Sequence, residues 1–281
     1  MIKRILKILI PGSAILGLSA GLGCRSNFDS QMLDSSDNLA QTPWISNGAK
    51  VKGPGLLAPA EALVWATKVP SHRSTVILSP GAAVPPDALS GLASALASTG
   101  RIVFVMSYFN NLPIIPGQAS KIGKLMNLLK ENPDGLNSLD PLLVNEYKTK
   151  RELPVSLVGY SAGGAILGSY IADSESPAKK VALYGVSTFV SPPDKIAANI
   201  GLFIGSKDGL LLGDDQAKEK VVKAEALLSK KRTILDGLNH FCIVSDPNVG
   251  APDYRARDLP TNLTSNQCIA ALTQALDGFL P

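Results

Sequence analysis

Side chains that bind transition metals are scarce in this sequence of 281 residues. The two histidines, His72 and His240, lie far apart, and the three cysteines form no Cys-x-x-Cys pair. Zinc sites are built from three or four such ligands at short spacings, so the sequence predicts no metal site. Aromatic residues make up only 5% of the chain, but 45% of residues are hydrophobic, which is enough for one globular domain with a sizeable core.

A strong excess of charge is also lacking once the N-terminus is set aside. The chain has 27 Lys and Arg against 23 Asp and Glu. Three of the basic residues, Lys3, Arg4 and Lys7, lie in the first 23 residues, which contain no acidic residue. The rest of the chain has no basic stripe, so the sequence predicts no nucleic-acid partner.

Residues 1–23 have the pattern of a secretory signal peptide. The basic residues precede an uncharged, mostly apolar run over 8–22, which is shorter than the roughly 20 residues that a membrane-spanning helix needs. Gly21-Leu22-Gly23-Cys24 resembles a bacterial lipobox, although Gly21 stands where leucine is preferred. We therefore expect an exported protein that is held at the membrane of the cell envelope by lipidated Cys24. The alternatives are secretion after ordinary signal cleavage and an uncleaved anchor.

Residues 24–50 are expected to form a flexible tether, and residues 51–281 a single domain in which strand-like and helix-like segments alternate. The predicted strands are 64–69, 74–79, 101–107, 154–158, 180–185, 199–205 and 232–236, and the predicted helices are 86–98, 118–130, 162–172, 214–229 and 265–280. The strands are apolar throughout, as in sheets that helices cover on both faces. The alternation predicts an α/β fold with a central, mostly parallel β-sheet flanked by helices on both faces.

The segment Gly159-Tyr160-Ser161-Ala162-Gly163 matches the pattern G-x-S-x-G. The pattern alone is weak, because Gly17-Leu18-Ser19-Ala20-Gly21 matches it too, inside the apolar run of the signal segment. Only Ser161 has the right context, between a predicted strand and a helix of small residues. A sharp strand-to-helix turn exposes a nucleophilic serine and needs glycine on either side, so Ser161 is the predicted nucleophile.

A nucleophilic serine needs a general base, and the sequence offers two histidines. His240 follows the last predicted strand, near the C-terminus, where the base belongs in the order serine, acid, histidine. His72 lies far upstream and is expected to be a solvated loop residue. The predicted base is therefore His240.

The acid of the triad is expected after the strand 199–205. Asp208 lies in the turn that follows this strand and is the predicted acid; a common Asp-Gly turn is the alternative explanation for it. Four of the other aspartates between Ser161 and His240 are rivals for this role. They are Asp194 in an earlier loop, Asp214 and Asp215 at an expected helix N-terminus, and Asp236 close to the end of its strand.

Two backbone N–H groups are needed to bind the oxyanion that forms when an ester is attacked. Ala162, directly after the nucleophile, is one predicted donor. Ala82 in the Pro80-Gly81-Ala82-Ala83 loop is the other, with Ala83 as the alternative. Tyr160 and Ala83 are predicted to contact the substrate. Three residues of the long loop 241–264 are further candidates for such contacts, but solvent exposure is the favoured explanation for them: Tyr254, Arg255 and Arg257.

Cys242 and Cys268 remain as a pair once Cys24 is assigned to lipidation. In an oxidising compartment a disulfide between them is expected, and it would tie the loop of His240 to the C-terminal helix. The alternative is two buried free thiols.

Taken together, the segments SPGAAVPPDAL, GYSAGG, FIGSKDG and GLNHF resemble the α/β-hydrolase superfamily. The likeness is greatest to its lidless branch of dienelactone-hydrolase-like, chlorophyllase-like and cutinase-like enzymes. Residues 186–198 are too few for a helical lid. The resemblance implies a serine hydrolase that cleaves small-molecule or lipid-like esters without a cofactor. Amidase, peptidase or thioesterase activity on the same triad, or a non-catalytic surface lipoprotein, remain alternatives. The sequence makes no prediction of oligomeric state.

Overall fold

The computed structural model describes residues 44–52, 61–67, 71–131, 140–149, 153–173, 175–176, 178–250 and 252–281. The predicted signal peptide, the lipidation site Cys24 and the first part of the predicted tether lie outside these residues. Within them, no helix combines the length and apolarity needed to cross a bilayer.

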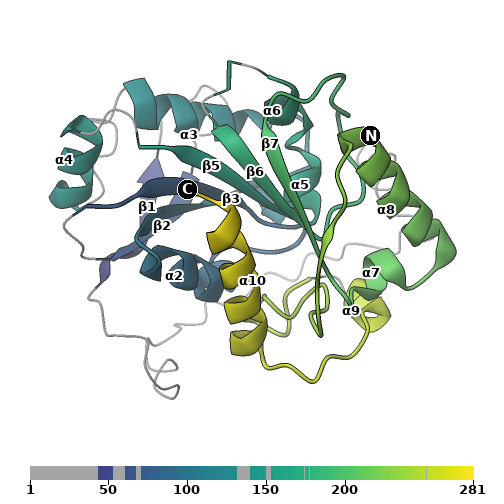
Figure 1. The fold of residues 1–281 in the computed structure, drawn as a ribbon. Coiled ribbons are helices and arrows are strands. Elements are labelled where there is room, and N and C mark those ends of the chain that lie inside the picture. The colour runs from purple at the N-terminus through teal and green to yellow at the C-terminus, as the bar shows by residue number, and fades with distance from the viewer. Residues whose placement is uncertain are drawn as a thin grey trace.

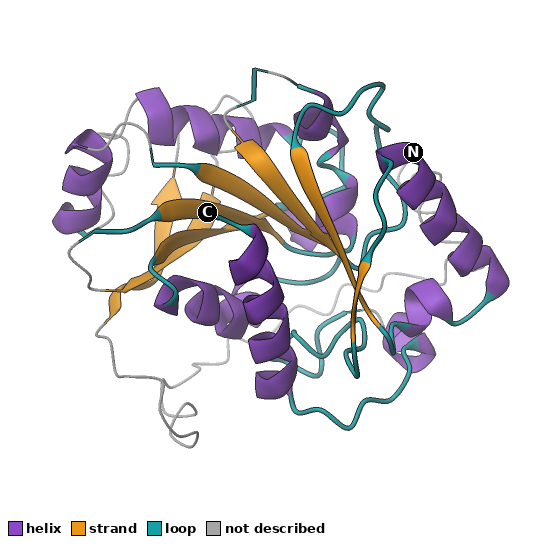
Figure 2. Cartoon of the chain, viewed as in Figure 1, coloured by secondary structure: helices purple, strands orange, loops and turns teal. Residues whose placement is uncertain are grey.

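An eight-stranded sheet in the order β1-β2-β4-β3-β5-β6-β7-β8 forms the centre of the molecule (Figures 1 and 2). Strands β3 to β8 pair in parallel, whereas β1 and β2 are antiparallel to their neighbours at one edge. The prediction of a mostly parallel α/β sheet is confirmed. The strands are β1 Trp44–Lys52, β2 Glu61–Thr67, β3 Ser74–Ser79, β4 Arg101–Ser107, β5 Val155–Tyr160, β6 Ala178–Tyr184, β7 Asn199–Gly205 and β8 Thr233–Leu235.

Helices cover both faces of the sheet (Figure 2). Because successive strand side chains point to opposite faces, Val76 and Leu78 of β3 pack with the helices α2 and α10, while Ile77 packs on the other face with α3, α4 and α6. The helical segments are η1 Pro86–Leu89, α2 Ser90–Ser98, η2 Phe109–Asn111, α3 Ser120–Glu131, α4 Pro141–Thr149, α5 Ala162–Ala165, α6 Gly168–Ala172, α7 Gly209–Leu212, α8 Asp215–Leu228, α9 Pro252–Arg257 and α10 Ser265–Phe279.

Four parts of the structure differ from the sequence predictions. The predicted helix 162–172 is broken into α5 and α6, because the Ala165 carbonyl accepts the Val190 N–H at 2.8 Å instead of continuing the helical ladder. The sheet reaches back to Trp44, into the range assigned to the tether. Helix α4 lies in a segment for which no element was predicted, and α9 lies within the long loop 241–264.

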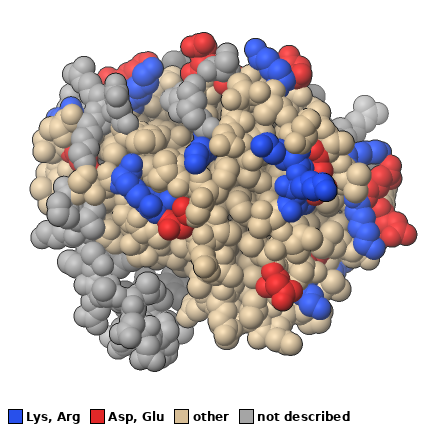
Figure 3. Space-filling model, viewed as in Figure 1, with Lys and Arg blue, Asp and Glu red and all other residues tan. Residues whose placement is uncertain are grey.

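The strand register brings the candidate site residues together at the end of the sheet where the parallel strands have their carboxyl ends. Tyr160 of β5 pairs with Tyr184 of β6, which pairs with Phe203 of β7. These positions are at or near the carboxyl ends of parallel strands, so the segments that follow them emerge on the same side. Those segments carry Ser161, Asp208 and, after β8, His240. On the face shown in Figure 3, the acidic and basic side chains of the described residues lie in small mixed groups separated by uncharged surface.

Candidate active site

Ser161 lies in a strained turn between β5 and α5. Its φ of 51° and ψ of −126° are unfavourable for a residue with a side chain. The neighbouring glycines make the turn possible. A Cβ at Gly163 would lie 2.2 Å from the Ser79 carbonyl oxygen, and one at Gly159 would lie 2.4 Å from Cα of Gly164. The backbone therefore requires glycine at both positions and raises the half-buried Ser161 above the sheet.

Replacing Gly163 by alanine should lower the free energy of unfolding by at least about 3 kcal/mol, because the new methyl group would overlap two backbone carbonyls. Gly278 provides the matched control. It lies in α10 with nothing within 4 Å of its Cβ position, so Gly278→Ala should stabilise the protein by up to about 1 kcal/mol. Urea unfolding of both variants measures the difference. Near-native stability of Gly163→Ala would contradict the close contact with the β3 loop.

Asp208 and His240 form a buried pair. Asp208 Oδ2 lies 2.7 Å from His240 Nδ1, and the exposed fractions of the two side chains are 0% and 2%. The second carboxylate oxygen of Asp208 accepts the Leu211 N–H at 3.1 Å and caps α7, which fixes the carboxylate. The other four candidate aspartates either make different contacts or are exposed. Asp214 caps α8, Asp215 is the first residue of that helix, Asp236 accepts a hydrogen bond from Ser206, and Asp194 is exposed.

The surroundings of His240 raise its pKa above the ordinary value. Burial of the imidazole is the largest single influence and opposes protonation, but the charge of Asp208, its hydrogen bond and the charge of Asp258 together outweigh it. The carboxylate of Asp208 thus stabilises the imidazolium form. This is the arrangement that a general base needs in order to accept a proton during a reaction.

Ser161 and His240 are fixed to the same corner of the sheet. The Ser161 N–H donates to the Tyr184 carbonyl at 2.9 Å. The next residue, Gly185, lies against the imidazole, since a Cβ there would be 2.8 Å from His240 Cε1. The φ of Gly185, +65°, also favours glycine. No residue with a side chain could occupy this corner without displacing His240.

Tyr160 does not line a substrate site, contrary to the sequence prediction. Its side chain is 1% exposed, and its ring packs between Tyr184 and His240, with centroid distances of 6.0 and 5.3 Å. Its hydroxyl donates to the His240 carbonyl at 3.1 Å. Burial raises the pKa of the Tyr160 hydroxyl well above its ordinary value. Tyr160 therefore supports the backbone of His240 from below.

The loop after β3 leaves the amide of Ala82 free. Among the described residues neither the Ala82 nor the Ala162 N–H has a hydrogen-bond acceptor, whereas the Ala83 N–H donates to the Asn111 carbonyl at 2.8 Å. That bond removes Ala83 as the alternative donor. Ala83, Asn110 and Asn111 all have positive φ, so this side of the site, like Ser161, has a strained backbone. Ala82 is half-buried and Ala83 is exposed, so a ligand above the loop could still reach Ala83.

His72 is not the solvated residue that the sequence suggested. It is 2% exposed, and its Nδ1 lies 2.5 Å from Glu146 Oε2 of α4, while Nε2 lies 3.0 Å from the Thr67 carbonyl oxygen. It lies just before β3, at the edge of the sheet opposite to Ser161. No local pattern indicates this burial, because Glu146 is distant in sequence and belongs to the helix that was not predicted.

Cys242 and Cys268 are joined by a disulfide, with their Cα atoms 5.9 Å apart. The bond links the residue two positions after His240 to the first turn of α10. The loop that carries His240 is thereby attached covalently to a helix of the core.

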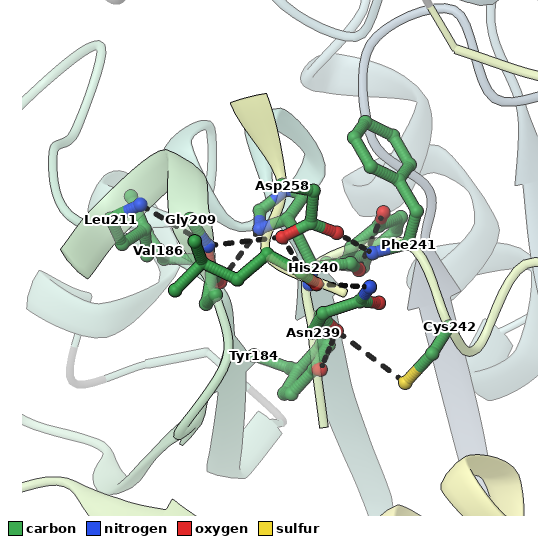
Figure 4. Close-up of polar contacts among 12 residues, drawn as sticks. Tyr184, Val186, Gly209, Leu211, Asn239, His240, Phe241, Cys242 and Asp258 are labelled. Atoms are coloured by element: carbon green, nitrogen blue, oxygen red, sulfur yellow. Dashed lines mark hydrogen bonds and ion pairs between the residues drawn. The ribbon is translucent and has the colours of Figure 1, made fainter. Parts of the chain in front are cut away.

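Asp258 is a residue of the site that sequence reasoning missed. It follows α9 directly, and its carboxylate accepts backbone N–H groups from Gly209, His240 and Phe241 (Figure 4). Arg255 and Arg257, which were considered for substrate contacts, have protein partners instead. Arg255 stacks 4.7 Å above the Phe241 ring and donates to loop carbonyls, and Arg257 donates to Asp214. Tyr254 is half-buried and packs near the core helices.

Two further observations on the described residues complete the description of the site. Among the described residues no group of three or more His, Cys, Asp or Glu side chains could hold a metal ion. No helix lies between β6 and β7, so nothing in that segment forms a helical lid over Ser161.

No family model and no curated protein sequence matches this chain. Solved structures do match it. A ferulic acid esterase from Streptomyces cinnamoneus has a TM-score of 0.57 at 15% identity, over 79% of this chain and 82% of its own. XC6422 from Xanthomonas campestris, an α/β serine hydrolase without a lid, has a TM-score of 0.54 at 12% identity, over 85% of this chain and 97% of its own. The dienelactone-hydrolase-like promiscuous phosphotriesterase P91 from metagenomic libraries has a TM-score of 0.52 at 15% identity, over 82% of this chain and 97% of its own.

At these identities the likeness concerns architecture, and activity has to be argued from the site itself. The structural likeness extends over 79%, 85% and 82% of this chain. The chain has the α/β-hydrolase fold.

Proposed function

We propose that this protein is a serine hydrolase that cleaves carboxylic esters through an acyl-enzyme on Ser161. The observation that carries the proposal is the buried Asp208–His240 pair at the corner where the Ser161 amide is bonded. The strained turn at Ser161 adds to it, since strain of this kind is concentrated at functional sites. The esterases and hydrolases of the same fold are consistent with ester chemistry.

In the first half of the reaction the Ser161 oxygen attacks the ester carbonyl carbon while His240 takes the hydroxyl proton. Asp208 accepts from Nδ1–H of His240, which leaves Nε2 as the basic nitrogen and stabilises the imidazolium that forms. The negative charge that develops on the carbonyl oxygen would be bound by the free N–H groups of Ala82 and Ala162.

His240 then gives its proton to the leaving alcohol, and the acyl group remains bonded to Ser161. In the second half His240 takes a proton from water, the hydroxide attacks the acyl carbon, and His240 returns the proton to the Ser161 oxygen as the acid leaves. Every proton in this sequence passes through His240. The chemistry uses side chains and backbone amides of this chain alone.

The surroundings of the site favour accessible, apolar esters. Phe109 follows β4 and Val190 follows β6, and the carboxyl ends of both strands lie on the side of Ser161. The exposed fractions of Phe109 and Val190 are 62% and 44%. The segment between β6 and β7 contains no helix that could cover the half-buried Ser161, which supports access for bulky acyl groups. An ester with a large apolar or aromatic acyl group is therefore the substrate class that we propose.

A fluorophosphonate probe tests the proposal directly, because it phosphonylates an activated serine. We expect one adduct per chain, located on the Ser161 peptide by mass spectrometry, and no adduct after heat unfolding. A folded protein that stays unlabelled, or that is labelled on another serine, would overturn the assignment. Paired p-nitrophenyl esters and p-nitroanilides with the same acyl group then separate esterase from amidase activity. Faster cleavage of the anilides would show the ester preference to be wrong.

A further inference from the structure

Asp258 connects the two loops that carry the acid and the base. Its Oδ1 accepts the N–H groups of Gly209 at 3.0 Å and of His240 at 3.1 Å, and its Oδ2 accepts the N–H of Phe241 at 3.0 Å (Figure 4). Gly209 directly follows Asp208. One carboxylate thus binds the backbone next to the acid and the backbone of the base itself.

Backbone packing at the same place supports this connection independently. A Cβ at Gly209 would lie 2.1 Å from the Arg257 carbonyl oxygen and 2.8 Å from Cα of Asp258, so the segment 257–259 lies directly against the acid turn. On the other side, the Asn239 side-chain amide donates to the Leu259 carbonyl at 2.8 Å. Residues 257–259 are therefore wedged between the loops of Asp208 and His240.

The charge of Asp258 is available for its three hydrogen bonds to backbone N–H groups. Among the described residues its carboxylate has no Lys or Arg ion-pair partner, and it is partly buried. Burial raises the pKa of Asp258 above its ordinary value, although its three backbone hydrogen bonds and His240 act in the opposite direction. An ionised carboxylate binds N–H groups more strongly than a neutral oxygen does, so the charge strengthens all three bonds.

We propose that Asp258 is a positioning residue of the hydrolase, which holds the backbone of His240 in register with the turn of Asp208 and places its charge beside the imidazole. The inference rests on the proposed function, because it assigns Asp258 a role in aligning the base of that reaction. Asp258 acts through His240 and does not itself touch the reacting atoms.

Replacing Asp258 by asparagine should separate this role from a purely structural one. The amide oxygen of asparagine could still accept from Gly209 and His240, but its NH₂ group would face the N–H of Phe241, and the charge would be lost. Because small misplacements of a catalytic group have large effects on rate, we expect kcat for a p-nitrophenyl ester to fall by at least about tenfold, with KM within about twofold.

The pH profile provides a second readout. The titratable groups around His240 are Asp208 at the N-cap of α7, Asp258 after α9, and Tyr160 and Tyr184 of β5 and β6, whose hydroxyls donate to the carbonyls of His240 and Asn239. Two cations belong to the same network, since Arg232 interacts with Asp208 and Arg255 with Tyr160. Loss of the Asp258 charge removes one of the influences that raise the pKa of His240. His240 then stays neutral to lower pH, so the acid limb of kcat/KM should move to lower pH. A purely structural contact would lower Tm without moving this limb.

Asp246→Asn is the matched control, because Asp246 lies in the same loop and its side chain accepts one backbone N–H, from Asn248 at 2.8 Å, without contacting His240. Its kcat and pH profile should equal those of the unaltered protein. If Asp258→Asn keeps kcat within twofold and its pH profile coincides with that of Asp246→Asn, the proposal is overturned.

Asp258→Glu keeps the experiment decisive if the asparagine variant does not fold. It retains the charge but lengthens the side chain by one methylene, so kcat should fall while the acid limb stays in place. An unchanged kcat in Asp258→Glu would contradict the positioning role. Failure of the proposed function itself is distinguishable, because the unaltered protein would then neither hydrolyse the ester nor react with the fluorophosphonate.

Discussion

Alanine in place of Ser161 is expected to lower kcat for p-nitrophenyl esters by about 10⁶-fold, the scale seen when the nucleophile of a serine hydrolase is removed. In the proposed mechanism the Ser161 oxygen forms the bond to the acyl group, and alanine has no oxygen at this position. KM should change little, because the Ser161 Cβ, the loop of Ala82 and the rest of the site are retained. Alanine also tolerates the backbone at this position no worse than serine does, so Tm should be preserved.

Ser19 supplies the control for this experiment. It occupies the same position in the other G-x-S-x-G segment, which lacks a preceding strand-like run. In the full-length chain Ser19→Ala should leave kcat unchanged. A Ser161→Ala variant that keeps more than about one hundredth of the activity would rule out the acyl-enzyme on Ser161.

Asparagine in place of Asp208 should reduce kcat by about 10⁴-fold while leaving the fold intact. The asparagine NH₂ cannot accept from Nδ1–H, so it favours the tautomer of His240 that has its proton on Nε2, where a general base needs a lone pair. The cap of α7 survives, because the side-chain oxygen can still accept the Leu211 N–H. The effect should therefore appear in kcat rather than in the free energy of unfolding.

The pH dependence of the same pair has a definite sign. The pKa of His240 is raised above 6.5 in the folded protein, so the unaltered enzyme should lose kcat/KM as the pH falls through a value above 6.5. Removing the Asp208 charge takes away the main influence that raises this pKa, and the acid limb of Asp208→Asn should move to lower pH. Asp236→Asn, which alters a neighbouring carboxylate bonded to Ser206, should keep the unaltered profile. An acid limb that does not move in Asp208→Asn would count against this pairing.

Local patterns in the sequence were sufficient to predict the fold class and to nominate the residues that meet at the site. The apolar strands and their order along the chain placed Asp208 and His240 after β7 and β8, and the structure brings these two together. Of the two aspartates expected at a helix N-terminus, Asp214 caps α8, whereas Asp215 is the first residue of the helix. These features depend on residues close in sequence or on chain order, which a single sequence contains.

The features that the sequence did not predict depend on contacts between distant backbone groups. Asp258 binds three N–H groups, which any residue could provide, so no motif marks it. The break between α5 and α6 arises because the loop 189–191 bonds to Ala165 and lies against Gly168. Tyr160 looked available because it adjoins the nucleophile, but strand alternation turns it into the core beneath His240.

Cys242 and Cys268 are 26 positions apart in sequence, and the disulfide between them closes the intervening chain into a covalent ring. This ring contains α9 and Asp258, and α10 begins just inside it. A protease that cut the chain at the exposed residues Pro252 or Leu259 would therefore leave two polypeptides joined through sulfur, with α10 and its core contacts still attached. On a denaturing gel, such nicked molecules would migrate as one species without a reducing agent and as two species when a reducing agent is present. Gel mobility therefore reports whether the ring is closed.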